Sequence, residues 1–267
     1  MYAALTTLIN RLDTLNTPEA NTVIKWGCPV ISFGDLPGSS IATLGLNPSN
    51  REFVDEAGQE LDGNFRRFPT LQSLGIKSWS EADARHLRTI VDSCRSYFYG
   101  NPYDRWFKRL DDVISATQAS FYDSTRCACH LDLIPYATGE KWTDLTPSQR
   151  TSLLQVAGDT LALLLRDSSV ELLVLNGQSV VSHFQQIAGV RLESKEMPGW
   201  CLPRKSGANV VGIAYEGMVN TLSGFSLGRN ILVLGYNHNL QSSFGVTTKV
   251  VEGIRDWIGK QHTRRFQ

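Results

Sequence analysis

The chain has 267 residues, of which 42% are hydrophobic and 19% charged, a composition typical of a globular protein that buries one sizeable core. Its 26 basic and 26 acidic side chains balance to a formal net charge of zero, which argues against a protein that coats nucleic acid by charge alone. No run of about 18 uncharged apolar residues occurs, so the sequence predicts a cytoplasmic protein with no membrane partner.

The first 50 residues combine one helical pattern with two strand-like runs. Residues 2–15 place apolar side chains at helical spacing, which predicts an opening helix. Residues 29–33 and 41–46 are short apolar runs bounded by Gly and Pro, as buried strands are. The second run ends in Gly-Leu-Asn-Pro-Ser at 45–49, so a polar loop is expected at the end of that strand.

The rest of the chain alternates the same two patterns. Helices are predicted at residues 81–98, 103–117, 146–166, 177–189 and 247–260, and strands at residues 127–136, 170–176, 208–215 and 230–236. Strands alternating with helices of this length predict an α/β fold, a three-layer α/β/α arrangement with a mainly parallel central sheet. No repeat or linker interrupts the pattern, so a single domain over residues 1–267 is expected.

The cysteines are predicted to be reduced thiols. They form neither an even set nor a Cys-x-x-Cys pair, which disfavours a disulfide framework or an iron–sulfur cluster. Cys127, Cys129 and His130 stand close together and could be metal ligands, but alternate residues of a buried strand explain them more simply. No metal and no other cofactor is expected, since no Gly-rich phosphate loop is present either.

Three predicted strands carry, at or just beyond their carboxyl ends, polar residues that could take part in binding or catalysis. Asn47 follows the strand at 41–46, Asp132 lies within the strand at 127–136, and His238 follows the strand at 230–236. Ligands of parallel sheets bind beyond the carboxyl ends of the strands. The sequence therefore predicts that these side chains share one site.

The same three segments resemble the motifs of the uracil-DNA glycosylase superfamily. They are Gly-Leu-Asn-Pro-Ser at 45–49, Asp-Leu-Ile-Pro at 132–135 and Asn-His-Asn-Leu-Gln-Ser-Ser at 237–243, and they match the family in order and strand context. The similarity spans residues 40–245, with flanking helices outside it. The resemblance implies a DNA glycosylase that flips a nucleotide, hydrolyses its N-glycosidic bond without a cofactor and leaves an abasic site.

The resemblance also implies roles for individual residues. Asn47 would orient the water that attacks the sugar, and His238 would donate a hydrogen bond to the base carbonyl oxygen as negative charge develops on it. The late loop departs from the family pattern, with Leu240 or Gln241 as the residue expected to insert into the minor groove and Ser242 as a further DNA contact.

Asp132 and Ser49 depart from the uracil enzymes in a way that points to cytosine. Uracil enzymes carry Asn where this chain has Asp132. A carboxylic acid offers one acceptor and one O–H donor, and this pair matches the amine and the ring nitrogen of cytosine. Ser49 stands where those enzymes place a Tyr that blocks the five position of the base. The pocket is therefore expected to admit a cytosine with a substituent at that position.

An aromatic ring is expected to stack on the flipped base, and Phe53, Phe65 and Phe68 are the candidates after the first motif. Arg66 and Arg67 are next to these aromatic residues and could either contact phosphates or lie on a solvent-exposed helix face. In the second mixed segment, Tyr103, Trp106 and Phe107 are interpreted as core residues of an amphipathic helix.

Excision of ordinary cytosine would destroy a cell's own DNA, so the substrate must be a marked cytosine. The chain is similar in this respect to bacterial antiphage glycosylases that excise alpha-glucosylated hydroxymethylcytosine from phage DNA, and a monomer acting on DNA is expected. Two alternatives are a repair glycosylase for uracil or another deaminated base, and a catalytically silent DNA-binding relative.

Overall fold

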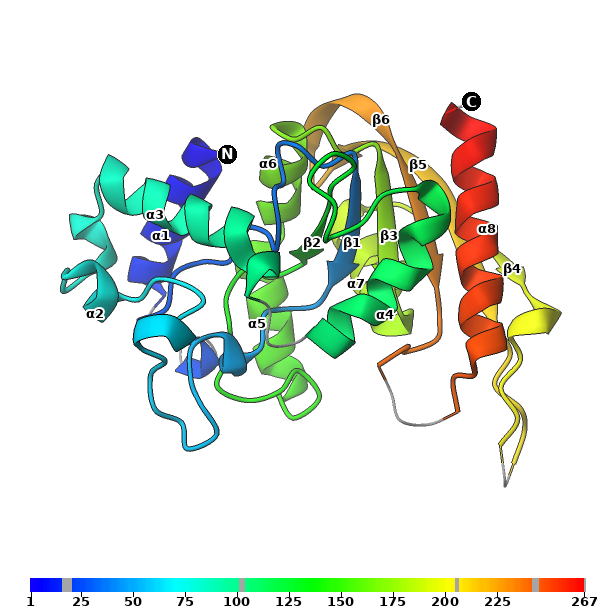
Figure 1. The fold of residues 1–267 in the computed structure, drawn as a ribbon, viewed down its shortest axis with the longest axis horizontal. Coiled ribbons are helices and arrows are strands. Elements are labelled where there is room, and N and C mark those ends of the chain that lie inside the picture. The colour runs from blue at the N-terminus through cyan, green and yellow to red at the C-terminus, as the bar shows by residue number, and fades with distance from the viewer. Residues whose placement is uncertain (16–20, 101–103, 205–206, 242–244, 267) are drawn as a thin grey trace.

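The computed structural model describes the whole chain except residues 16–20, 101–103, 205–206, 242–244 and 267 (Figure 1). The α-helices are α1 (Tyr2–Thr14), α2 (Leu71–Leu74), α3 (Ala84–Ser96), α4 (Asp104–Ile114), α5 (Pro147–Ala157), α6 (Thr160–Arg166), α7 (Gln178–Ala188) and α8 (Thr248–Phe266). The strands are β1 (Ile41–Gly45), β2 (Ala128–Asp132), β3 (Leu172–Asn176), β4 (Glu193–Glu196), β5 (Ile213–Leu222) and β6 (Phe225–Tyr236). Short 3₁₀ turns include η2 (Asn50–Glu52), η3 (Gly63–Phe65), η5 (Tyr97–Tyr99), η6 (Ser115–Thr117) and η7 (Pro198–Trp200).

The strands form one sheet in the order β2-β1-β3-β6-β5-β4. The first four run parallel to one another, whereas β5 and β4 are antiparallel to their neighbours. Thr43 of β1 pairs with His130 of β2, and Gly45 pairs with Asp132. This register places the first residues of the first and second sequence motifs side by side, at the carboxyl ends of adjacent strands.

Helices cover the sheet on its two faces. In Figure 1, α4 and α8 pack together in front of the strands, and α6 and α7 pack on β3, β5 and β6 behind them. Every residue of β1 is buried, and all of them except Thr43 are apolar. The predicted α/β fold with a mostly parallel sheet is confirmed, and the arrangement is compatible with three α/β/α layers. Within the described residues, no helix is both long and apolar enough to cross a membrane.

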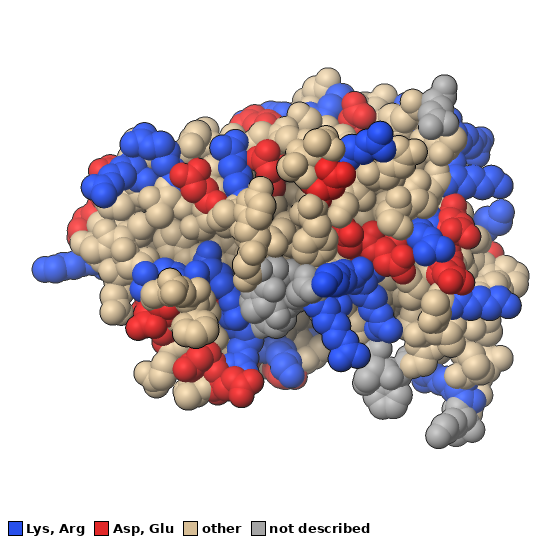
Figure 2. Space-filling view, in the orientation of Figure 1, with Lys and Arg blue, Asp and Glu red and all other residues tan. Residues whose placement is uncertain are grey.

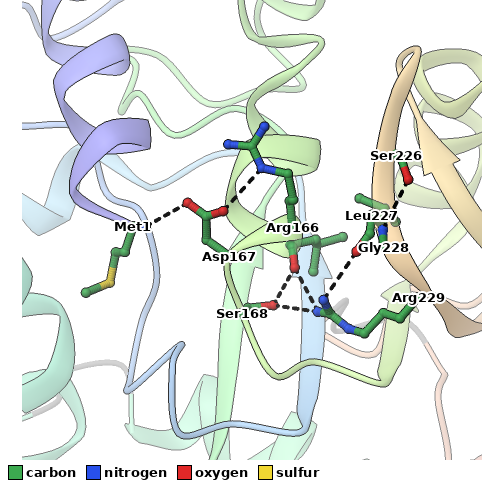
Figure 3. A network of polar contacts seen from close by, with 9 residues as sticks. Met1, Arg166, Asp167, Ser168, Ser226, Leu227, Gly228 and Arg229 are labelled. Atoms are coloured by element: carbon green, nitrogen blue, oxygen red, sulfur yellow. Dashed lines mark hydrogen bonds and ion pairs between the residues drawn. The ribbon is translucent and has the colours of Figure 1, made fainter.

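The amino-terminal edge of the sheet is held by polar contacts away from the motifs (Figure 3). Arg229, near the start of β6, donates to the carbonyl oxygens of Leu165 and Val170 and to Ser168 Oγ, at 2.8–3.1 Å. The Met1 ammonium forms an ion pair of 3.0 Å with Asp167 in the same connection. These contacts fix the entry into β3 at the edge opposite the motif loops.

Several predicted elements differ from the structure. Residues 29–33 are not a strand, although Phe33 forms one isolated bridge with His130. The predicted helix at 146–166 is two helices, α5 and α6, which break at Gly158. The strand predicted at 208–215 is in fact β5, which runs from Ile213 to Leu222.

The antiparallel half of the sheet arises from a tight hairpin that the sequence analysis did not predict. Ser223 and Gly224 link β5 to β6, and both have positive φ, 49° and 79°. Two residues with positive φ form the turn whose twist matches that of paired antiparallel strands. Once β6 has joined β3 in parallel, this turn sends β5 back along it and makes the sheet mixed.

Candidate active site

A cavity of about 590 Å³ lies at the carboxyl ends of the parallel strands. This volume is in the range of small-molecule sites, about 300–1,000 Å³. Its polar lining includes Asn47, Ser49, Asn50, Glu52, His130, Asp132, Thr138, Asn176, Asn239 and Gln241. The loops after β1, β2, β3 and β6 therefore meet here, as expected for a ligand site in such a sheet.

Asn47 is held by its amide nitrogen. Its Nδ2 donates to Thr138 Oγ1 at 2.9 Å and to the Pro48 carbonyl oxygen at 3.1 Å. The Thr138 hydroxyl gives its own proton to the Glu140 carbonyl oxygen at 2.7 Å, so its oxygen can only accept from Asn47. This fixes the amide orientation. Among the described residues, no hydrogen bond occupies Asn47 Oδ1, which is left as an acceptor at the cavity.

Asp132 is a buried acid, 7% exposed, at the end of β2. His130 Nε2 lies 3.5 Å from Asp132 Oδ1, and His130 Nδ1 lies 2.6 Å from the hydroxyl of Thr43. If the hydroxyl donates to Nδ1, Nε2 carries the ring proton and points it at the carboxyl group. Gly45 makes room for this pair, because a Cβ there would collide with Asp132 Oδ1 and lie 2.8 Å from His130 Nε2.

Ser49 organises the turn that follows the first motif. Its Oγ accepts from the Arg51 backbone N–H at 3.2 Å and so caps η2. The side chain is exposed and lines the cavity. The turn that it caps directs Glu52 inward.

Glu52 is a functional candidate that the sequence analysis missed. It is 3% exposed and lines the cavity, and its Oε1 accepts a hydrogen bond of 2.9 Å from the Tyr97 hydroxyl. Burial raises the pKa of Glu52 to about 7, against the opposing effect of Arg67. An acid in a surface-like loop carries no sequence signal of burial, so only the tertiary structure reveals this group.

The late loop approaches the cavity through residues other than its histidine. Gln241 Oε1 accepts from Asn176 Nδ2 at 3.1 Å, and Asn176 Oδ1 accepts from the Tyr236 hydroxyl at 2.8 Å. Leu240 is fully buried, and its carbonyl oxygen accepts from Arg109, so in this conformation it is not an inserting wedge. Ser242 lies outside the described residues.

The structure does not bring His238 to the cavity. Its side chain is 3% exposed, and its Nε2 donates to the Trp200 carbonyl oxygen at 2.6 Å. Burial lowers the pKa of His238 below its usual value, which favours the neutral ring. A neutral imidazole has one N–H, and here it is already donated. In this arrangement the ring therefore has no proton to offer to a base.

The aromatic residues predicted to stack on a base lie elsewhere. Phe53 and Phe68 are 1% exposed in the core, with ring centroids 5.9 Å apart, whereas Phe65 is 76% exposed and outside the cavity. The spacing of apolar residues cannot distinguish the buried phenylalanines from the exposed one, because their burial depends on where the loop folds back. The aromatic lining comes instead from Phe33, Trp106, Phe107 and Trp142. The interpretation of Trp106 and Phe107 as mere core residues is thus incomplete.

Arg66 and Arg67 are both half-buried. Arg67 donates to the Arg51 carbonyl oxygen and lies 3.6 Å from Glu52 Oε2, so it belongs to the inner structure of this loop. More exposed cations occur nearby. Figure 2 shows Lys and Arg gathered over the lower middle of the face, beside the start of α4, where Arg105 is exposed.

The metal alternative receives no geometric support from the described part of the chain, which holds no group of three potential His, Cys, Asp or Glu ligands. Cys129 and His130 are consecutive residues of β2 and point to opposite faces of the sheet. Burial raises the pKa of the Cys129 thiol to about 12, which keeps it protonated.

No protein-family model and no curated protein matches this chain.

Proposed function

We propose that the chain is a DNA glycosylase of the uracil-DNA glycosylase superfamily that hydrolyses the N-glycosidic bond of a modified cytosine. One observation carries the proposal. Asn47 and Asp132, chosen from separate sequence motifs, lie at the ends of neighbouring strands and line the same cavity, each with polar atoms available to a ligand. A reader of the base and a holder of the nucleophile are the two groups that the reaction needs.

The geometry of Asn47 suits the positioning of water. Its unoccupied Oδ1 can accept a hydrogen bond from a water molecule, while Thr138 and Pro48 hold the amide still. When the bond between the sugar C1′ and the base N1 breaks, its electron pair leaves with the base, and the oriented water adds to C1′. An amide is a weak base, so the contribution of Asn47 is orientation toward an oxocarbenium-like sugar.

Asp132 is proposed to read the base. The cytosine edge presents an exocyclic amine donor that a carboxyl oxygen can accept, whereas uracil presents a carbonyl acceptor there. His130 orients the carboxyl group from one side, and Gly45 leaves space for both. The fixed carboxyl group would therefore favour cytosine-type bases over uracil.

A substituent at the five position is proposed to enter beside Ser49. The cavity has room for more than a bare pyrimidine, and Ser49 leaves its mouth open. We propose alpha-glucosylated hydroxymethylcytosine of phage DNA as the substrate, and antiviral defence in the cytoplasm, by a monomer, as the role. Cations beside the start of α4 would meet the DNA phosphates around the flipped nucleotide.

The test is excision from matched oligonucleotides that carry uracil, cytosine, hydroxymethylcytosine or its alpha-glucosylated form, followed by alkali to cleave abasic sites. We expect cleavage of the glucosylated strand. Cleavage of the uracil strand alone would identify a repair glycosylase. DNA binding without cleavage of any strand would identify a silent relative.

Two variants test the assigned roles. Asn47→Ala should lower single-turnover excision by about 100-fold or more with DNA affinity within a few-fold, because orientation of water matters chiefly in the transition state. Asp132→Asn should lose the cytosine-type substrate and gain weak action on uracil. Asp111→Asn, a change of the same kind near η6 and outside the cavity lining, serves as the control. Equal excision of the cytosine-type base by Asp132→Asn and wild type would refute the base-reading role.

A further inference from the structure

Glu52 is held in a defined position at the cavity. Ser49 caps the short η2 turn that carries it, and the Tyr97 hydroxyl donates to its Oε1 at 2.9 Å. The side chain is 3% exposed, so these contacts are made away from bulk water. The fold thus holds the Glu52 side chain in place at the site and does not leave it solvated on a surface loop.

The second oxygen of Glu52 lies in an ion pair with Arg67 but accepts no hydrogen bond from the described residues. Oε2 is buried without a hydrogen-bond partner among the described residues, and Arg67 Nη1 lies 3.6 Å away, beyond hydrogen-bond distance. Buried polar atoms are nearly always paired, and each exception calls for a physical reason. Because Glu52 lines the cavity, a bound ligand is the natural partner for this atom.

The groups around Glu52 decide its charge. Arg67 from the loop after η3 and Tyr97 from η5 favour the carboxylate, whereas burial and the negative charge of Asp132 on β2 favour the neutral acid. Burial is the largest of these effects, and the resulting pKa of about 7 leaves a substantial neutral fraction at neutral pH. The two buried carboxyl groups that line the cavity are easiest to accommodate when one of them keeps its proton.

We infer that Glu52 is a second base-reading group: its carboxyl O–H donates to the ring nitrogen N3 of the cytosine, while Asp132 accepts from the exocyclic amine. The inference rests on the proposed function. Glu52 then takes the donor role and Asp132 the acceptor role, whereas the sequence alone assigned both roles to Asp132. A donor beside an acceptor is the complement of the cytosine edge.

The same contact would assist departure of the base. As the C1′–N1 bond breaks, its electron pair moves into the ring, and the Glu52 proton passes to N3, so the base leaves neutral. The water held at Asn47 supplies hydroxide to C1′, and the proton that it releases returns through solvent to the Glu52 carboxylate. Cytosine, a poor leaving group as an anion, thereby needs no external acid.

The experiment measures the second-order rate constant of excision from pH 5.5 to 9, on the alpha-glucosylated strand, for wild type, Glu52→Gln, Glu52→Leu and the control Asp111→Asn. The wild-type rate should fall about tenfold per pH unit above about pH 7, because only the neutral acid donates. Glu52→Gln retains an N–H donor but cannot titrate, so it should keep measurable activity and lose the alkaline decline. Glu52→Leu should lose excision by about 100-fold or more, and Asp111→Asn should follow the wild-type profile.

The outcomes separate this inference from the function on which it rests. If wild type excises the base with a rate that does not change between pH 6 and 9, or if Glu52→Leu matches wild type, Glu52 does not read the base although the glycosylase assignment stands. If wild type cleaves none of the strands at any pH, the proposed function fails and the inference fails with it. A persistent alkaline decline in Glu52→Gln would assign the titration to another group and overturn the proton-donor role.

Discussion

Side chains in the loops that follow the parallel strands divide into those whose polar atoms are already paired within the protein and those with one atom left unpaired. His238 and Asn237 belong to the first kind: the ring of His238 bonds the Trp200 carbonyl, and the amide of Asn237 bonds the backbone of Val211 and Ile213. Asn47 and Glu52 belong to the second kind. Unpaired atoms at a cavity mark where a ligand completes the hydrogen bonding.

Trp106 is predicted to stack on the flipped base. It is partly buried at the start of α4, lines the cavity, and has its ring edge-on to His130 at 5.4 Å. Stacking on an aromatic ring is worth about 1–3 kcal/mol per base, so Trp106→Ala should weaken excision by roughly 5- to 150-fold. Phe65→Ala, at the exposed aromatic that sequence reasoning proposed, should have no effect in the same single-turnover assay. The reverse result would show that the loop after β1 closes over the base.

The raised pKa of Glu52 predicts a dependence of stability on pH that needs no substrate. The folded state favours the proton, so the stabilisation is complete below the ordinary pKa of about 4.5 and is lost as pH rises through about 7. The loss is on the order of 3 kcal/mol for a group this deeply buried. Urea unfolding at pH 5 and pH 8 should show this loss in wild type and less of it in Glu52→Gln. Identical pH dependence in both proteins would mean that Glu52 is solvated.

At the scale of elements, the end of β1 couples the two motifs through a glycine. Gly45→Ala would place a methyl group against Asp132 and His130, both of which are fixed by the parallel pairing of β1 and β2. We expect a loss of excision of at least tenfold, with cost to stability as well, since neither neighbour can move without leaving the site. Gly199→Ala, at an open position in η7, is the matched control. Normal excision by Gly45→Ala would show that Asp132 tolerates displacement.

The β5–β6 hairpin shows how a local signal can determine the architecture of an element pair. Ser-Gly between two alternating apolar segments is a turn signal, and its two positive φ values form the turn that antiparallel strands require. The predicted strands at 208–215 and 230–236 cover only the apolar runs. They therefore omit residues 216–222 and 225–229, which complete β5 and β6.

At the scale of the whole molecule, zero net charge hides an uneven distribution. Basic side chains gather beside the start of α4 (Figure 2). DNA binding through them should weaken as the salt concentration rises, because the release of counterions from the DNA then becomes less favourable. Arg105→Glu should lower DNA affinity and reduce the slope of log affinity against log salt by about 1 to 2. Arg88→Glu, at an exposed residue of α3 outside the cavity lining, should leave the slope unchanged. Equal slopes for all three proteins would place the DNA on another face.

The sequence by itself determined the α/β class, most helices and parallel strands, and the meeting of Asn47 with Asp132. These follow from local periodicity and from the rule that parallel strands end at one edge, and both are written in neighbouring residues. Only the tertiary structure decided that His238 turns toward Trp200, that Phe53 and Phe68 enter the core, and that Glu52 is buried at the cavity. The direction and burial of a loop side chain depend on packing against segments far away in the chain, and no local pattern records those contacts.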